Sequence, residues 1–229
     1  MNKIKEYQEI INYKIKKVRI QGNPDELYNP INYILSLKSK RVRPTLSILS
    51  YSLFKKDLNK ITEPSIALEF FHNFTLIHDD IMDNAEIRRG KDTIHKKWNK
   101  NIGILSGDLL MIFAYKMLEN IDNKSFKKTF ERFNNIAIKV CEGQQYDMNF
   151  EIKNEISEDD YLKMITLKTA VLIGFSLELG GLIANQEKQI TDQLYLAGEK
   201  IGISFQLMDD YLDVFGNVEF GKKIGGDIL

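Results

Sequence analysis

The sequence predicts an all-α protein of about eight or more helices, and three observations lead to this prediction. The 229 residues include only 4 prolines and 14 glycines, so long stretches carry no residue that would break a helix. Apolar residues recur at three- and four-residue steps, which is the period of a helix face that packs on a core. No run of short alternating strands bounded by Asn-Gly or Asp-Gly turns is found.

Apolar stripes at helical spacing occur in three parts of the chain. Their members are Ile4, Tyr7, Ile11, Ile15 and Val18, then Ile66, Phe70, Asn73, Ile77 and Ile81, and then Phe126, Phe130, Phe133, Ile136 and Val140. Breaks between helices are expected near 22–24, 38–40, 89–90, 120–124, 154–157 and 185–187. Ser157 followed by Asp160 is a capping box that opens a helix. No clear linker interrupts the pattern, so residues 1–229 are expected to form one domain.

Composition and charge exclude several classes of protein. The 32 basic and 32 acidic residues give a formal net charge of +0, which argues against nucleic-acid binding because such proteins carry a basic excess or stripe. A hydrophobic content of 43% excludes a disordered chain. Cys141 is the single cysteine, so no intrachain disulfide can form. The lysine-rich N-terminus is not a secretory signal, and no membrane span is apparent, so the cytosol is the expected location.

Two acidic motifs of the same form stand far apart in the chain. They are Asp79-Asp80-Ile81-Met82-Asp83 and Asp209-Asp210-Tyr211-Leu212-Asp213. Residues four apart share a helix face, so Asp79 and Asp83 are expected to lie one turn apart on one side. Like charges at this spacing destabilise a helix unless water or a cation compensates. A single motif of this kind is as often a solvated acidic face as a ligand site. Two such motifs, each next to apolar residues expected to be buried, indicate a common ligand.

The residue types in these motifs indicate the kind of ligand. Carboxylate oxygens without cysteine or clustered histidine spacing suit Mg²⁺ better than zinc. Mg²⁺ typically binds a few carboxylates and completes its shell with phosphate oxygens. The two motifs therefore predict a diphosphate held between them through metal ions.

Arginines are few and clustered. Of 32 basic residues only six are arginine, and four of these form the pairs Arg41/Arg43 and Arg88/Arg89. The planar guanidinium grips a phosphate through two N–H groups at once, which lysine cannot do. Arg88 and Arg89 follow the first acidic motif closely, so they are expected to reach a phosphate held there. The alternative is chance clustering, with local salt bridges to Glu86 and to the aspartates.

All three histidines, His72, His78 and His95, fall in this same region. His72 precedes Asp79 by seven residues, which places it two turns away on the same helix face. A hydrogen-bonded structural role is favoured for His78 and His95.

In order along the chain, these motifs resemble those of the trans-type isoprenyl diphosphate synthases, the polyprenyl synthetase family that includes farnesyl and geranylgeranyl diphosphate synthases. The resemblance extends from about residue 24 to the C-terminus. It comprises Lys40-Arg41-Val42-Arg43-Pro44, His72, His78-Asp79-Asp80-Ile81-Met82-Asp83, Arg88-Arg89-Gly90, Gly143-Gln144-Gln145-Tyr146-Asp147, Lys168-Thr169, Phe205-Gln206, Asp209-Asp210-Tyr211-Leu212-Asp213, and Gly221-Lys222 through Gly226-Asp227. Each motif is weak alone, whereas all of them in order are a specific signal.

The resemblance implies an isoprenoid synthase helical bundle with a central active-site cavity, Mg²⁺ as cofactor and a homodimer. The implied metal ligands are Asp79, Asp83 and Asp209, with Asp80 and Asp213 in support. The residues implied to hold the allylic diphosphate are Arg88, Lys168, Thr169, Gln206 and Lys222. Those implied to hold isopentenyl diphosphate are Lys40, Arg43, His72 and Arg89.

The implied reaction condenses isopentenyl diphosphate with an allylic diphosphate. Mg²⁺, Arg88 and Lys168 would stabilise the negative charge on the departing diphosphate. In this family, bulky residues just before the first acidic motif limit the length of the product. Phe74 and Thr75 occupy these positions, and one aromatic there resembles the short-chain enzymes, with geranylgeranyl favoured over farnesyl. The alternative is that Phe74 is simply a core residue.

Two features depart from the family pattern. Lys38 and Ser39 stand where the family usually has two glycines, and a backbone with positive φ would be strained there, so a looser or differently shaped isopentenyl subsite is expected. The chain also ends at Leu229, before the helices that family members carry beyond the second motif. It is therefore expected to lack those helices, as a natural short form or as a fragment.

Three functions are consistent with parts of this sequence. The favoured one is an active prenyltransferase. A terpene cyclase or squalene-type condensing enzyme is disfavoured, because those families pair one aspartate motif with a different second metal motif. A non-catalytic subunit that partners a complete synthase is the remaining alternative, although both aspartate motifs are intact here.

Overall fold

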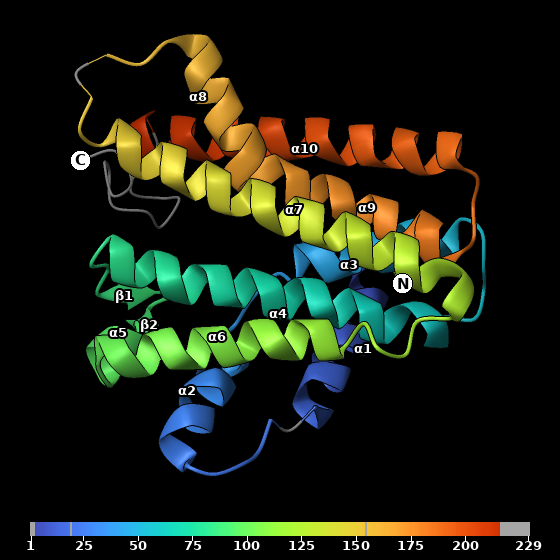
Figure 1. Ribbon diagram of the computed structural model, residues 1–229, viewed down its shortest axis with the longest axis horizontal. Helices are drawn as coiled ribbons and strands as arrows, with labels where there is room; N and C mark the ends of the chain where they lie inside the picture. The colour runs from blue at the N-terminus through green and yellow to red at the C-terminus, as the bar shows by residue number, and fades with distance from the viewer. Residues whose placement is uncertain (1–2, 19, 154, 216–229) are drawn as a thin grey trace. The chain divides into compact units, whose positions relative to one another are not determined.

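A computed structural model describes residues 3–18, 20–153 and 155–215 of the chain. The chain divides into two compact units, Met1–Phe126 and Lys127–Leu229 (Figure 1). The described residues form ten α-helices, one π-helix and a two-stranded hairpin. The prediction of an all-α protein is therefore confirmed, while the short hairpin was not predicted.

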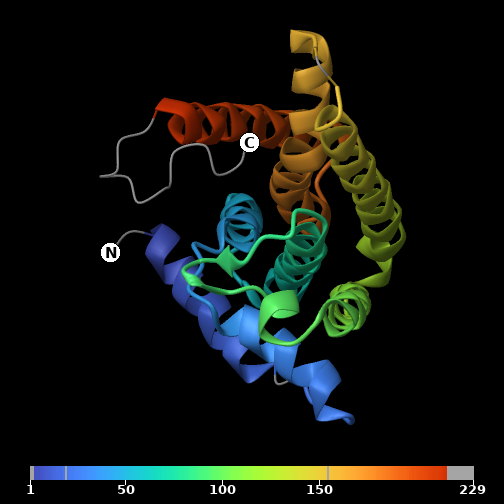
Figure 2. The same ribbon diagram turned by 90° about the vertical axis from the view of Figure 1, so that its left-hand side faces the viewer.

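The first unit is built around one long buried helix. Its elements are α1 (Lys3–Lys17), α2 (Asp25–Ser36), α3 (Val42–Ser52), α4 (Asn59–Met82), β1 (Ile87–Arg88), β2 (Lys91–Asp92), α5 (Ile94–Lys97) and α6 (Lys100–Lys116). Helix α4 packs against α3 and α6 and also contacts α1 and α5 (Figures 1 and 2). Consecutive residues from Ile66 to Phe71 are almost fully buried. A helix buried on all sides is apolar on all sides, so α4 carries more than the single stripe that its sequence predicted.

The hairpin β1–β2 follows α4 directly, and its turn is the pair Arg89-Gly90. Ile87 pairs with Asp92, and Arg88 pairs with Lys91. Arg89 has φ of +54° and Gly90 has φ of +73°, the combination found in a type I′ turn. Glycine adopts this conformation without strain, whereas arginine does so at a cost of about 1 kcal/mol. The break expected at 89–90 is thus a tight turn that fixes the direction of two arginines.

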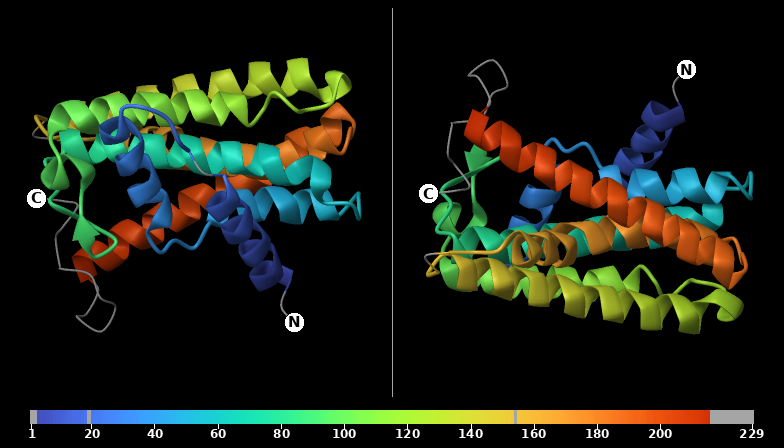
Figure 3. Two further views of the ribbon diagram at one scale, coloured as in Figure 1. Left: turned by 90° about the horizontal axis from the view of Figure 1, so that it is seen from below. Right: turned by 90° about the horizontal axis from the view of Figure 1, so that it is seen from above.

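The second unit contains four α-helices and the π-helix. These are α7 (Asn123–Phe150), whose first residues belong to the first unit, then α8 (Glu158–Ile165), η1 (Thr166–Ala170), α9 (Val171–Ile183) and α10 (Lys188–Phe215). Ser157 caps α8 by accepting a hydrogen bond from the amide of Asp160 at 3.1 Å, which confirms the predicted capping box. Helices α9 and α10 run side by side (Figure 3).

The segment Glu158–Ile183 is long and apolar enough to cross a membrane by length and composition. It is, however, 78% buried within the protein over its most apolar window, which is typical of a core helix. Phe175 of α9, for example, is fully buried and contacts Phe133 of α7, with ring centroids 6.1 Å apart.

One expectation about burial is wrong. The large apolar residues before the second acidic motif were expected to be buried, yet Phe205 and Met208 are 52% and 58% exposed. Helix α10 instead buries the face that carries Gly198 and Gly202, because glycines let its backbone approach the neighbouring helix closely. Large side chains on the other face of α10 consequently remain accessible.

Candidate functional site

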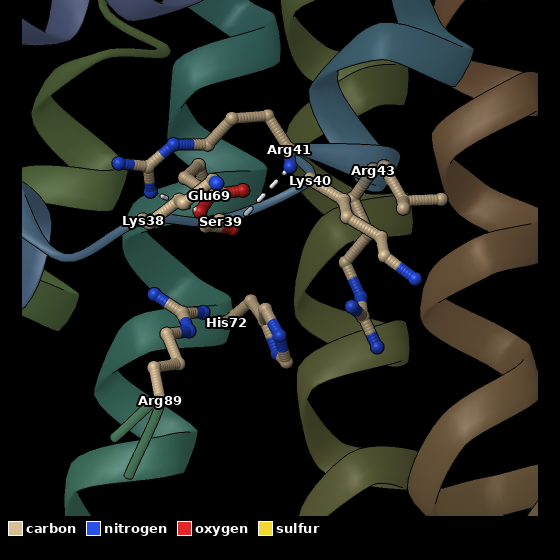
Figure 4. Close-up of a pocket in the computed structure, with 9 residues that line it drawn as sticks. Lys38, Ser39, Lys40, Arg41, Arg43, Glu69, His72 and Arg89 are labelled. Atoms are coloured by element: carbon tan, nitrogen blue, oxygen red, sulfur yellow. Dashed lines mark hydrogen bonds and ion pairs between the residues drawn. The ribbon is translucent and has the colours of Figure 1, made fainter. Parts of the chain in front are cut away.

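A pocket of about 310 Å³ in the first unit gathers all four residues expected to hold isopentenyl diphosphate. Lys40 and Arg43 come from the start of α3 and the loop before it, His72 from α4, and Arg89 from the hairpin turn. The guanidinium groups of Arg43 and Arg89 lie on opposite sides of the His72 ring (Figure 4). The remaining residues of the lining are Lys38, Ser39, Arg41, Val42 and Glu69.

A series of hydrogen bonds between buried polar groups connects two sides of this pocket to α4. Arg41 donates to Glu69 at 2.5 Å, and its other guanidinium nitrogen donates to the carbonyl of Leu35 at 2.6 Å. The amide of Asn73 donates to the Glu69 carboxylate at 3.0 Å. Arg89 then donates to the side-chain oxygen of Asn73 at 3.4 Å. Because Glu69 and Asn73 are one turn apart on a rigid helix, these hydrogen bonds position the loop before α3 and the hairpin turn relative to each other.

The pocket carries a strong excess of positive charge. Five cationic side chains and a single carboxylate, Glu69, line it. The pKa of Arg43 is lowered to about 10, chiefly by burial and also by the nearby Arg89, against the opposing effect of Glu69. Burial, followed by Arg43 and Arg89, holds the pKa of His72 well below 6.5, so this imidazole is neutral at pH 7. Positive charges that lower one another's pKa in this way repel one another, and a bound anion of high charge would stabilise them.

A buried donor of Arg43 supports the same conclusion. Its Nε is inaccessible to solvent and has no hydrogen-bond partner among the residues that the structure describes. A buried donor without a partner is costly, and a phosphate oxygen is a suitable acceptor for a guanidinium.

The expected strain at Lys38 and Ser39 is not found. Neither residue has a positive φ; on this stretch it is Arg41, at +47°, that does. Both residues lie in the pocket lining without a positive φ, so their presence in place of glycine imposes no left-handed strain on the loop.

The first acidic motif occupies the C-terminal end of α4. Asp83 is the residue that ends the helix, and its amide donates to the carbonyl of Asp79 at 2.9 Å, so the two side chains share a face as predicted. Asp80 points the other way into the protein and is 1% exposed. It accepts a hydrogen bond from Arg88 Nε at 2.6 Å, and Arg88 also lies 3.8 Å from Asp79. Asp80 therefore anchors Arg88 beside the motif.

The chain-length candidates lie one turn before this motif. Phe74 is buried and contacts the rings of Phe71 and His78, with centroids 5.6 and 4.8 Å away. The hydroxyl of Thr75 donates a hydrogen bond to the carbonyl of His72 at 2.8 Å. Nε2 of His78 is hydrogen-bonded to the carbonyl oxygen of Ile104 at 3.1 Å, in keeping with the structural role favoured for His78.

In the second unit, Lys168 and Thr169 are consecutive residues of the π-helix and bond to different helices. Lys168 forms an ion pair with Asp147 of α7. Thr169 donates to the side-chain oxygen of Gln206 on α10 at 2.9 Å. Gln206 in turn donates to Asp210 at 2.8 Å, and Asp210 also accepts a hydrogen bond from Tyr161. Two of the residues expected at the allylic diphosphate, Thr169 and Gln206, thus lie in one network, and Lys168 is held separately by Asp147.

The aspartates of the second motif differ in their surroundings. Asp209 is half-buried, and Asp213 is 2% exposed. Lys222, also expected at the allylic diphosphate, lies outside the described residues.

The donor set fits a hard divalent cation. Asp79 and Asp83 offer carboxylate oxygens at the negative end of the α4 dipole, where a cation is stabilised. Over the described residues, no three or more histidine, cysteine, aspartate or glutamate side chains come together closely enough to hold a metal by themselves.

Glu69, Asn73, Asp147 and Tyr161 are site residues that sequence reasoning missed. For Glu69 and Asn73 the signal was a polar residue on an otherwise apolar helix face, at a spacing of four. Asp147 belongs to a recognised motif to which no role was given. Nothing in the sequence distinguishes Tyr161 from other tyrosines.

Comparison with known proteins decides the family. Residues 24–229 match the model of the polyprenyl synthetase family. A geranylgeranyl pyrophosphate synthase from Geoglobus acetivorans is 36% identical over 228 residues, which cover 99% of this chain and 72% of the relative. The chain belongs to the polyprenyl synthetase family.

Solved structures agree with this membership of the polyprenyl synthetase family. A crystal structure of a geranylgeranyl pyrophosphate synthase matches with a TM-score of 0.95 and 45% identity, over 100% of this chain and 70% of that one. A geranylgeranyl pyrophosphate synthetase from Pyrococcus horikoshii matches with a TM-score of 0.92 and 35% identity, over 98% of this chain and 70% of that one. The predicted family, the helical-bundle fold class and the prenyltransferase reaction class are thus confirmed.

Proposed function

We propose that this polyprenyl synthetase condenses isopentenyl diphosphate with an allylic diphosphate to give a trans-prenyl diphosphate and inorganic diphosphate. Geranylgeranyl diphosphate is the favoured product, because the relatives named above are geranylgeranyl pyrophosphate synthases. Mg²⁺ is the proposed cofactor, and a cytoplasmic homodimer is the proposed working state.

The observation that carries the proposal is the cationic pocket of the first unit. The four residues expected from the sequence to hold isopentenyl diphosphate all line this one pocket, namely Lys40, Arg43, His72 and Arg89. Their guanidinium and ammonium groups suit a diphosphate, which brings two to three negative charges and many acceptor oxygens. We assign isopentenyl diphosphate to this pocket.

For the allylic diphosphate we propose Lys168, Thr169, Gln206 and Lys222 from the second unit, together with Arg88 from the first. The support for this assignment is the hydrogen bond from Thr169 to Gln206 and the separate ion pair that holds Lys168 on Asp147. Asp79, Asp83 and Asp209 are the proposed ligands of Mg²⁺. When bound, Mg²⁺ neutralises charge on the departing diphosphate.

The chemistry follows from where charge develops. Breaking the allylic C–O bond leaves an allylic cation and places an additional negative charge on the released diphosphate. Arg88 and Lys168 stabilise that charge, most effectively where water is excluded. The double bond of isopentenyl diphosphate attacks the cation to form the new C–C bond, and the released diphosphate accepts the proton lost from the adduct. No protein side chain is required as the general base.

A product assay tests the proposal. The protein is incubated with Mg²⁺, labelled isopentenyl diphosphate and each of three allylic primers of increasing length, and the extracted products are sized. Elongation that ends mainly at geranylgeranyl diphosphate is expected. A folded protein that elongates no primer would refute the proposal and leave the non-catalytic subunit as the remaining role.

The Arg89→Lys variant tests the assignment of the pocket. Lysine keeps the charge but loses the two-pronged contact and the hydrogen bond to Asn73, so the KM for isopentenyl diphosphate should rise by about tenfold. Arg132→Lys is the matched control, because Arg132 pairs with Glu178 within the second unit and should affect stability without changing this KM. An increase confined to the KM for the allylic substrate would contradict the assignment.

A further inference from the structure

The π-helix η1 interrupts a continuous helical segment at the residues proposed to bind the allylic diphosphate. Residues 158–183 form α8, η1 and α9 without a break, and only Thr166–Ala170 have π geometry. Such single-turn π segments are rare and often occur at functional sites. The turn contains both Lys168 and Thr169, so what holds it in place affects both side chains.

Gly143 of α7 lies against the backbone of this turn. A Cβ on Gly143 would lie 2.6 Å from the carbonyl carbon of Leu167 and 2.6 Å from Cα of Lys168, with the Lys168 amide nitrogen nearer still. Real Cβ atoms are not found so close to other atoms, and backbone atoms cannot swing aside as a side chain can. Any larger residue at 143 must therefore displace the π turn.

Gly202 of α10 has the same relation to the far end of the turn. A Cβ there would lie 2.5 Å from Cα and 2.9 Å from Cβ of Ala170. The π-helix is thus flanked by two helices, each of which contacts its backbone at a glycine.

Each of these helices also presents a polar side chain one turn after its glycine. On α7 the pair is Gly143 and Asp147, and Asp147 forms the ion pair with Lys168. On α10 the pair is Gly202 and Gln206, and Gln206 accepts from Thr169. Residues four apart share a helix face, so on each side one face provides both the close approach and the polar contact.

We propose that Gly143 and Gly202 form a clamp that positions Lys168 and Thr169 for the allylic diphosphate. The glycines set how closely α7 and α10 approach the π turn, and Asp147 and Gln206 then direct the two side chains. Gly143, Gly202 and Asp147 are positioning residues, since they act through Lys168 and Thr169. This inference rests on the proposed function, because it assigns a task to residues of that site.

The test compares alanine variants that differ in what the added methyl group meets. In Gly143→Ala and Gly202→Ala the added methyl group clashes with backbone atoms of the π turn. Gly198→Ala is the matched control, because its Cβ would lie 2.8 Å from Cα of Gly174 and from the carbonyl oxygen of Ile173, which are backbone atoms of α9 outside the turn. Alanine normally stabilises a helix relative to glycine, so any loss of stability in the three variants reports the clash.

Thermal unfolding and steady-state kinetics are measured for the wild type and for each variant. We expect Gly143→Ala and Gly202→Ala to lower kcat/KM for the allylic diphosphate by about 10- to 100-fold, as small misplacements of binding groups do, with an unchanged KM for isopentenyl diphosphate. Gly198→Ala should lose comparable stability but little activity. Equal kinetic losses in all three variants, or equal effects on both substrates, would overturn the proposal.

A fourth variant keeps the test decisive if the alanine variants do not fold. Asp147→Asn adds no volume and still accepts a hydrogen bond from Lys168, but it removes the charge that orients the ammonium group. It should lower kcat/KM for the allylic diphosphate at unchanged thermal stability, whereas wild-type kinetics would overturn the proposal. An inactive wild-type enzyme would instead refute the proposed function, so the two failures are distinguishable.

Discussion

At the scale of single residues, the most informative side chains are polar groups on faces that should be apolar. Glu69 and Asn73 are 1% and 0% exposed on α4, and both are bonded. A buried carboxylate is tolerated when it is paired and hydrogen-bonded, and Glu69 accepts from Arg41 and Asn73. Their polarity was visible in the sequence, but their partners were not, because Arg41 and Arg89 reach them from distant parts of the chain.

His72 makes stability depend on pH in a predictable direction. Burial and the surrounding Arg43, Arg89, Arg88 and Arg41 depress its pKa in the folded protein well below the unfolded value of 6.5. The stability that comes from keeping this imidazole neutral is complete above pH 6.5 and is lost as pH falls below it toward the folded pKa. His72→Gln should therefore show a smaller decrease in melting temperature between pH 7 and pH 5 than the wild type.

An anion provides the control for this measurement. Inorganic diphosphate bound in the pocket offsets the charge of the arginines and should reduce the pH dependence of the wild type toward that of His72→Gln. If the variant and the wild type lose melting temperature equally on acidification, His72 is not the group responsible.

At the scale of elements, the hairpin shows how local backbone geometry serves the site. A type I′ turn at Arg89-Gly90 reverses the chain immediately after α4. This turn directs Arg88 to Asp80 and Arg89 to Asn73. The sequence predicted a break here but not a hairpin, because each strand is only two residues long and leaves no alternating pattern.

Gly90 allows this geometry to be tested without a steric clash. A Cβ at Gly90 would meet nothing within 4 Å, so Gly90→Ala acts only through its φ of +73°. Alanine should cost about 1 kcal/mol of turn stability and raise the KM for isopentenyl diphosphate by several-fold through Arg89. Gly90→Asn should be closer to the wild type, since asparagine tolerates a left-handed conformation. Equal kinetics for the two variants would show that turn geometry does not control the pocket.

Helix α10 shows, at the same scale, that the spacing of apolar residues does not always predict which face of a helix is buried. Its apolar residues Phe205 and Met208 predicted a buried face, yet the face that packs is the one with Gly198 and Gly202. A glycine carries no hydrophobic signal, so a packing face made by close backbone approach is invisible to a search for apolar stripes.

At the scale of the whole molecule, the length of the product is the property that most needs a measurement. Phe74 is packed between Phe71 and His78 in the core of the first unit. If it also limits the growing chain, Phe74→Ala should shift the products toward longer prenyl diphosphates, as measured by sizing the extracted alcohols.

Phe71→Ala is the control for this prediction. Both substitutions remove a buried aromatic ring and should cost about 3–5 kcal/mol, but only Phe74 occupies the position expected to limit chain length. An unchanged product spectrum in Phe74→Ala, from a protein that remains folded, would assign Phe74 to core packing alone. A shift in both variants would indicate general loosening of the unit.

The sequence by itself determined the family, the all-α class, the positions of most helix breaks and the four residues that line the cationic pocket. It could do so because helical period, capping residues and motif order are local properties of a chain. Only the tertiary structure decided that Asp80 is buried as the anchor of Arg88, that Glu69 and Asn73 connect two loops, and that two glycines flank a π turn. Those features depend on which distant residues come into contact, because burial and pairing are set by the packed neighbours and not by a residue's own type.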